Sequence, residues 1–160
     1  MDPGNVQHLK AVMGHFCSGV VVVTALHEGR PVGFTCQSFA SLSLDPPLVV
    51  AAPAKRSTTF PLIRAAGSFV ANILAEQQAE LARAFAVSGA DKFAGVRWTL
   101  GAVGAPILDG ALGWAGCRIV AEHEAGDHTL VVGEVRELGH APAGAPLTFF
   151  RGRFTALRSA

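Results

Sequence analysis

The sequence has no tyrosine, only three cysteines among 160 residues, and a charged fraction of only 16%. Without tyrosine, no phenol can act as a general acid or base. Cys17, Cys36 and Cys117 are odd in number and lie far apart with no C-x-x-C pair, so we expect neither a disulfide framework nor a zinc site. Such thiols are typical of a reducing compartment, and we therefore expect a cytoplasmic protein.

Neither sign of charge predominates, because 13 Lys and Arg residues nearly balance 12 Asp and Glu residues and leave a net charge of +1. No whole-molecule field is available to hold a nucleic-acid backbone. The uncharged stretch between Lys10 and Glu28 contains histidine, serine and glycine, whereas a membrane helix needs about 20 mainly apolar residues. We expect no nucleic-acid partner and no membrane span.

Several nucleotide and hydrolase motifs are missing: there is no G-x-G-x-x-G after a strand, no P-loop and no G-x-S-x-G elbow.

Half of the residues are apolar, which is enough to form the core of a single domain over residues 1–160. Periodicity and capping residues predict helices at Val6 to Phe16, Ser57 to Ala66 and Glu76 to Val87. They predict strands at Gly19 to Leu26, Leu48 to Ala52, Ser68 to Leu74, Ala111 to Glu124, Thr129 to Leu138, Leu147 to Phe150 and Phe154 to Leu157. Because strands outnumber helices and mostly follow one another directly, we expect a mainly β fold, an antiparallel barrel with peripheral helices.

The segment from Thr35 to Pro47 mixes hydroxyl groups with apolar side chains. A flat heteroaromatic ligand needs this combination, with an apolar surface against its ring face and donors along its polar edge. The alternative is an edge strand whose serines hydrogen-bond to nearby backbone.

A second segment, Ala52 to Thr59, joins a strand end to a helix start and carries Lys55, Arg56 and hydroxyl groups. Free N–H groups and cations suit a phosphate. The alternative is a capped helix with two solvated cations. Because this segment follows the serine-rich one by a single strand, one ligand could span both.

The third segment is the turn signal from Glu122 to His128. If Ala125 to Asp127 form a tight turn, His123 and His128 could approach each other, although a metal site would need a third ligand. We favour a turn that points His128 into a cleft, with Gly126 allowing the unusual backbone angles. The remaining alternative is an exposed hairpin tip.

In this order, these segments resemble the short-chain flavin reductase family, the NAD(P)H:flavin oxidoreductase components of two-component flavin monooxygenases. The resemblance covers most of the chain and is carried by Phe16 to Thr24, Gly33 to Thr35, Ser38-Phe39, Ser41 to Pro47, Phe69 to Leu74, Lys92-Phe93 with Trp98, Gly126 to His128, and Pro146 to Phe154.

The resemblance implies a homodimeric antiparallel split β-barrel with peripheral α-helices and with flavin near the dimer interface. The implied flavin contacts are Thr35, Cys36, Gln37 and Ser38 along the ring, Ser41, Leu42 and Ser43 near the ribityl chain or ring edge, Ala52, Lys55, Arg56, Ser57 and Thr58 near the phosphate, and Lys92 and Phe93. The implied nicotinamide dinucleotide contacts are Gly126, Asp127, His128 and Arg151. No metal is implied.

The implied activity is oxidation of NADH, in preference to NADPH, with reduction of FAD or FMN by hydride transfer from nicotinamide C4 to flavin N5. The reduced flavin then serves a separate flavin-dependent monooxygenase. His128 is the residue assigned to catalysis, where it positions the nicotinamide. Because His128 lies far along the chain from Thr35 to Thr58, we expect it to act on nicotinamide binding and not on flavin binding.

Two alternatives stay open. The first is a non-catalytic split-barrel module that binds flavin or haem, which would keep the serine-rich and phosphate segments but would not need Gly126-Asp127-His128. The second is an enzyme like pyridoxamine phosphate oxidase, which shares the barrel but lacks these motifs in this order.

Overall fold

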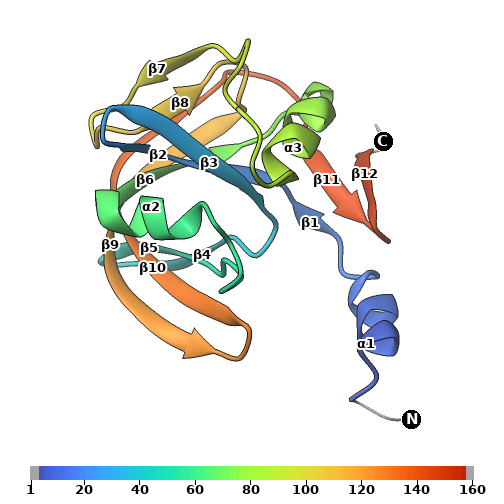
Figure 1. Ribbon diagram of the computed structural model, residues 1–160. Helices are drawn as coiled ribbons and strands as arrows, with labels where there is room; N and C mark the ends of the chain where they lie inside the picture. The colour runs from blue at the N-terminus through green and yellow to red at the C-terminus, as the bar shows by residue number, and fades with distance from the viewer. Residues whose placement is uncertain (1–3, 158–160) are drawn as a thin grey trace.

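A computed structural model describes residues 4–157 of the chain, and residues 1–3 and 158–160 of the predicted domain lie outside the described residues (Figure 1). The helical elements are α1 (Val6–Met13), α2 (Phe60–Ala66), the 3₁₀ turn η1 (Glu76–Gln78) and α3 (Ala79–Ala86). The strands are β1 (Ser18–Gly19), β2 (Val21–His27), β3 (Arg30–Cys36), β4 (Ala40–Leu44), β5 (Pro47–Ala51), β6 (Ser68–Ile73), β7 (Trp98–Leu100), β8 (Pro106–Leu108), β9 (Gly113–Ala125), β10 (His128–His140), β11 (Leu147–Phe150) and β12 (Arg153–Ala156).

The main sheet has seven strands in the order β3-β2-β6-β9-β10-β5-β4, and every pairing in it is antiparallel. Smaller antiparallel sheets join β1-β11-β12 and β7-β8. The prediction of a mainly β, antiparallel fold with few helices is therefore confirmed. Within the described part of the chain, no helix combines the length and apolar character needed to cross a membrane.

Local signals start α1 and end α2 as predicted, whereas α1 ends at Met13 and not at Phe16. The Oδ1 atom of Asn5 accepts hydrogen bonds from the amides of Gln7 and His8 at 3.0 and 3.1 Å, which starts α1. The Ser57 hydroxyl accepts one from the amide of Phe60 at 3.1 Å, at the start of α2. Gly67 ends α2 in the left-handed conformation, with φ 75°.

Several other elements differ from the prediction. The serine-rich segment contains strand β4, which pairs with β5 at the edge of the main sheet, in agreement with the edge-strand alternative. The predicted helix from Glu76 begins as the 3₁₀ turn η1 and becomes α-helical only at Ala79. The short β7-β8 hairpin was not predicted, because strands of three residues carry too little periodicity.

Strand β2 is buried on both faces, which explains its run of valines. Val21 and Val23 pack with Phe60 and Ile63 of α2 in one apolar cluster. On the opposite face, Val22 belongs to a second cluster that includes Phe85 and Leu108. The sheet is therefore covered by α2 on one face and by α3 with the β7-β8 hairpin on the other (Figure 1).

A buried polar network fastens β8 to this sheet. The Asn72 side chain donates to the carbonyl of Val22 and to the Thr24 hydroxyl, both at 3.1 Å, and accepts from the amide of Leu108 at 2.8 Å. The Thr24 hydroxyl donates to the carbonyl of Pro106 at 2.5 Å. Asn72 and Thr24 are fully buried, so each lost bond would leave a polar group without water.

We expect Asn72→Ala to lower the free energy of unfolding by about 2–4 kcal/mol, because the amide of Leu108 and the carbonyl of Val22 lose their hydrogen bonds to this side chain. Urea denaturation measures this change. The matched control is Gln77→Ala, which removes an exposed amide and should stay within about 0.5 kcal/mol of the parent protein. Equal losses for both variants would contradict a stabilising role for the network.

Candidate functional site

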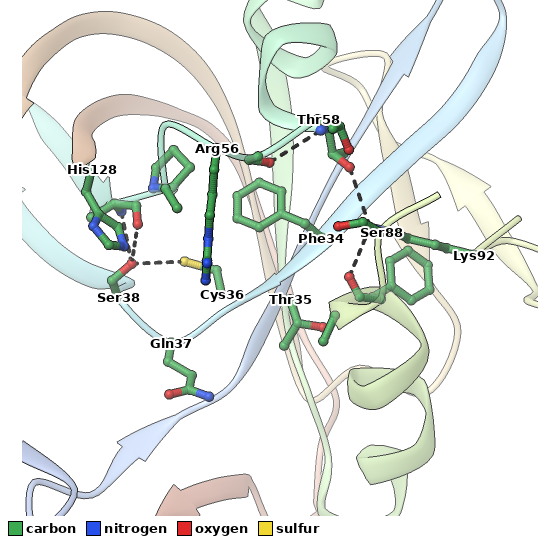
Figure 2. A pocket seen from close by; sticks show the side chains of 17 residues that line it. Phe34, Thr35, Cys36, Gln37, Ser38, Arg56, Thr58, Ser88, Lys92 and His128 are labelled. Carbon is green, nitrogen blue, oxygen red and sulfur yellow. Dashed lines mark hydrogen bonds between the residues drawn. The ribbon is translucent and has the colours of Figure 1, made fainter. Parts of the chain in front are cut away.

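A cavity of about 760 Å³ opens between β3, the loop after β5, the approach to α2, the end of α3 and the start of β10 (Figure 2). The structure brings ten of the predicted site residues into its lining. They are Thr35, Cys36, Gln37, Ser38, Ala52, Arg56, Ser57, Thr58, Lys92 and His128. Its volume lies within the range of small-molecule and cofactor sites.

Backbone hydrogen bonds join the turn before β10 to the loop after β5. The amide of Lys55 donates to the carbonyl of Asp127 at 2.9 Å, and the amide of Thr129 donates to the carbonyl of Pro53 at 3.0 Å. Between them, Ala54 and His128 form an antiparallel bridge. His128 therefore lies beside the predicted phosphate segment, and its distance along the chain is wrong as a reason for a separate role. That His128 acts on nicotinamide and not on flavin binding stays a prediction.

The edge of the cavity near Ser38 is closed by bonds within the protein. The Ser38 hydroxyl donates to the carbonyl of Ala52 at 3.0 Å and accepts from the amide of Ala52 at 3.1 Å, while the sulfur of Cys36 lies 3.3 Å away. Burial raises the pKa of the Cys36 thiol, so it stays protonated at neutral pH. These side chains shape the cavity but offer a ligand few free donors.

The wall opposite is built from β3 and α3. The Thr35 hydroxyl donates to the carbonyl of Ala82 at 2.5 Å, which ties the two elements together. A Cβ atom on Gly33 would lie 2.9 Å from the ring of Phe85, so only glycine lets this ring lie against the β3 backbone. With Phe34 beside it, this wall supplies the apolar surface that a flat ring needs.

Other polar side chains in the lining keep their hydrogen-bonding capacity. Gln37, Arg56, Thr58 and Ser88 make no side-chain hydrogen bond or salt bridge to another residue in the range 4–157. Figure 2 shows Arg56 extending between the side that holds His128 and Ser38 and the side that holds Phe34. An apolar wall and free donors around one hollow fit a flavin, whose ring is flat and whose chain ends in a phosphate.

The two neighbouring cations of the phosphate segment are not equivalent. Lys55 forms a salt bridge with Glu124 and does not line the cavity. Arg56 lines it with no such partner in the described part of the chain. A phosphate in this cavity would therefore meet Arg56, the Ser57 and Thr58 hydroxyls and no second free cation.

His128 enters the lining with one ring nitrogen already committed. Its Nδ1 atom lies 2.7 Å from the Oδ1 atom of Asp127, and because a carboxylate only accepts, Nδ1 carries the proton. This hydrogen bond lowers the pKa of the Asp127 carboxyl. The Nε2 atom is thus left for a ligand. His123 pairs with Leu130 and not with His128 in the sheet, and it does not line the cavity.

The remaining predicted site residues lie outside the lining. Ser41, Leu42 and Ser43 lie on the edge strand β4, Phe93 packs edge-on against Phe85 at 4.9 Å, and Gly126 and Asp127 form the turn that carries His128. Among residues 4–157, no group of His, Cys, Asp or Glu side chains is suitably gathered for a metal ion.

Arg151 belongs to a different part of the surface. It sits in the turn between β11 and β12 with φ 47°, and its guanidinium lies 2.7 Å from Nε2 of His15. It lines a separate hollow of about 450 Å³ together with Arg153 and Phe154. Within one chain, the structure does not bring Arg151 to the main cavity.

Sequence reasoning missed Phe34, Phe85 and Ser88 as lining residues. Phe85 belongs to the buried core and Phe34 packs against a core cluster, so neither carries a local signal of a site. Ser88 lies just beyond the predicted helix, where no local pattern points to a site. Its place in the lining depends on α3 packing against β3, which local pattern does not encode.

Comparison with known proteins identifies the family. The family model described as "Flavin reductase like domain" matches residues 13–158. The chain belongs to the flavin reductase family. The resemblance drawn from the ordered motifs is thereby confirmed.

Individual flavin reductases are similar over nearly the whole chain. The reductase subunit HsaB of a flavin-dependent monooxygenase from Mycobacterium tuberculosis is 43% identical, covering 92% of this chain and 80% of the relative. The FMN reductase (NADH) SmoA from Agrobacterium fabrum is 41% identical, covering 94% of this chain and 85% of the relative. The structure of the NADH:FAD oxidoreductase SgcE6 from Streptomyces globisporus, solved with NAD and FAD fragments, superposes with a TM-score of 0.92 at 38% identity, covering all of this chain and 96% of that one.

Proposed function

We propose that this protein is an NADH-dependent flavin reductase that supplies reduced FAD or FMN to a separate flavin-dependent monooxygenase. The observation that carries the proposal is the cavity, which combines an aromatic wall with unpaired polar side chains in a chain of the flavin reductase family. The names of HsaB, SmoA and SgcE6 support the same activity and include both flavins. A purely binding module receives no support from these relatives.

In this proposal the isoalloxazine lies along Thr35 to Ser38 and against Phe34, and the phosphate lies toward Arg56, Ser57 and Thr58. The hydroxyls of Thr35 and Ser38 are engaged within the protein, so they hold the wall in place while backbone groups and Gln37 face the ring edge. The cavity lining does not extend to Ser41, Leu42, Ser43, Lys55 or Phe93, whose predicted flavin contacts therefore draw no support from it.

Hydride transfer from nicotinamide C4 to flavin N5 needs two stacked rings and no strong base. His128 suits this chemistry as a positioning group, since Asp127 fixes its Nδ1 proton and leaves Nε2 for the nicotinamide carboxamide. Arg56 lines the cavity and forms no salt bridge with another described residue, and it is assigned to the flavin phosphate. Among the described lining residues, no further unpaired cation is left for the 2′-phosphate of NADPH, which favours NADH.

The proposal includes a homodimer with the split-barrel form of the fold. Apolar side chains of α1 and the residues after it, namely Val6, Leu9, Val12, Met13 and Phe16, are each more than half exposed in a single chain. A second copy would cover such a face.

Light scattering at low micromolar concentration should give about twice the 16.6 kDa of one chain, and a mass of one chain would contradict the dimer.

The activity is tested by following NADH consumption at 340 nm with and without added FAD or FMN. We expect turnover that requires added flavin and saturates with it, because the flavin acts as a substrate that leaves reduced. Turnover at full rate without added flavin would indicate a tightly held prosthetic group instead. Flavin binding without any NADH oxidation would contradict the reductase proposal.

We expect His128→Ala to reduce kcat/KM for NADH about tenfold, because it removes a hydrogen bond that positions the hydride donor. Flavin affinity, measured by titration of flavin fluorescence on the same variant, should change much less. The matched control is His123→Ala, an exposed histidine on the same hairpin and outside the cavity, which should behave like the parent protein. Loss of flavin binding with normal NADH kinetics would contradict the assignment.

A further inference from the structure

The ammonium group of Lys92 is held by three oxygen atoms of the protein. Its Nζ atom lies 3.0 Å from the carbonyl of Gly33, 3.1 Å from the carbonyl of Phe85 and 3.5 Å from the hydroxyl of Thr59. An ammonium has three N–H donors and no acceptor, so these contacts use its full capacity. Lys92 therefore has no N–H left for a ligand in this arrangement.

The three acceptors belong to the three segments that wall the candidate flavin cavity. Gly33 lies on β3 beside Phe34 and Thr35, Phe85 lies in the last turn of α3, and Thr59 immediately precedes α2. The Thr35 bond to Ala82 already joins β3 to α3. Lys92 adds the start of α2, and with it the stretch that carries Arg56 and the free hydroxyl of Thr58.

The three hydrogen bonds of Lys92 lie in a partly buried environment. Lys92 is partly buried, and burial lowers the pKa of its ammonium group. Its side chain also borders a second hollow of about 280 Å³, and Thr58 and Thr59 line both hollows. Lys92 thus lies between the two hollows, and its ammonium group is hydrogen-bonded to oxygen atoms of the protein.

We propose that Lys92 is a positioning residue for flavin binding, which sets the phosphate end of the cavity relative to its aromatic wall without contacting the flavin. This inference rests on the proposed flavin reductase function. Because binding energy is lost when a site must first be ordered, a cavity whose walls are already tied together binds more tightly than a loose one.

The decisive variant is Lys92→Met, which keeps most of the apolar stem and removes the three donors. We expect the flavin dissociation constant, measured by fluorescence titration of folded protein, to rise about tenfold or more. The melting temperature of the flavin-free protein should fall as well, because the three bonds exist without ligand. The matched control is Arg30→Met at the exposed start of β3, outside the lining of the main cavity, which should leave both quantities unchanged.

Lys92→Arg separates positioning from direct charge contact, and it remains informative if Lys92→Met does not fold. Arginine keeps the positive charge, but its planar fork cannot direct three N–H groups from one nitrogen at these oxygens. Positioning therefore predicts weakened flavin binding for Lys92→Arg too. A charge that contacts the flavin phosphate would predict retained affinity.

The outcomes distinguish the possibilities. Weakened flavin binding in both variants, with a lowered melting temperature for the flavin-free protein, supports the positioning role. Unchanged flavin affinity in Lys92→Met would overturn it, since Lys92 would then serve stability alone. Parent-like affinity in Lys92→Arg, with loss only in Lys92→Met, would also overturn it in favour of a charge contact. Failure of the parent protein to bind flavin would instead overturn the proposed function itself.

Discussion

The site depends on one backbone pairing, between the tip of the β9-β10 hairpin and the loop after β5. Hydrogen bonds of Lys55 with Asp127 and of Thr129 with Pro53 hold the two chain segments together. Without them, His128 would not reach the cavity that β3, α2 and α3 enclose. Because β10 also pairs along its length with β5 and β9, the long hairpin is anchored on both sides, and its turn is aimed by the whole sheet.

The polar groups around the cavity are of two kinds. The hydroxyls of Thr35 and Ser38 and the ammonium of Lys92 form hydrogen bonds within the protein, and these bonds connect the segments that line the cavity. Arg56 and Thr58 are free to meet a ligand. A reaction that moves a hydride between two stacked rings needs rigid placement more than proton transfer, and this division provides it.

The sequence predicts well the features that depend on neighbouring residues. It predicts poorly the contacts that depend on how distant strands pair. The caps at Asn5 and Ser57 and the stop at Gly67 act within a few residues, so pattern alone places them. The approach of His128 to Ala54 joins segments far apart in the chain, and only the strand register brings it about. The separation of Arg151 from the cavity has the same origin, since its turn belongs to the small β1-β11-β12 sheet.

The close approach of Phe85 to Gly33 limits how this cavity can change. Behind the wall that β3 and α3 form, the fully buried ring of Phe85 lies against the backbone of Gly33 with no room for even a methyl group between them. Substitutions on that wall would therefore damage the packing before they altered what the cavity accepts. Adaptation of this chain toward another flavin or dinucleotide is channelled to the opposite rim and to the loops, where Gln37, Thr58 and Ser88 can vary without disturbing the core.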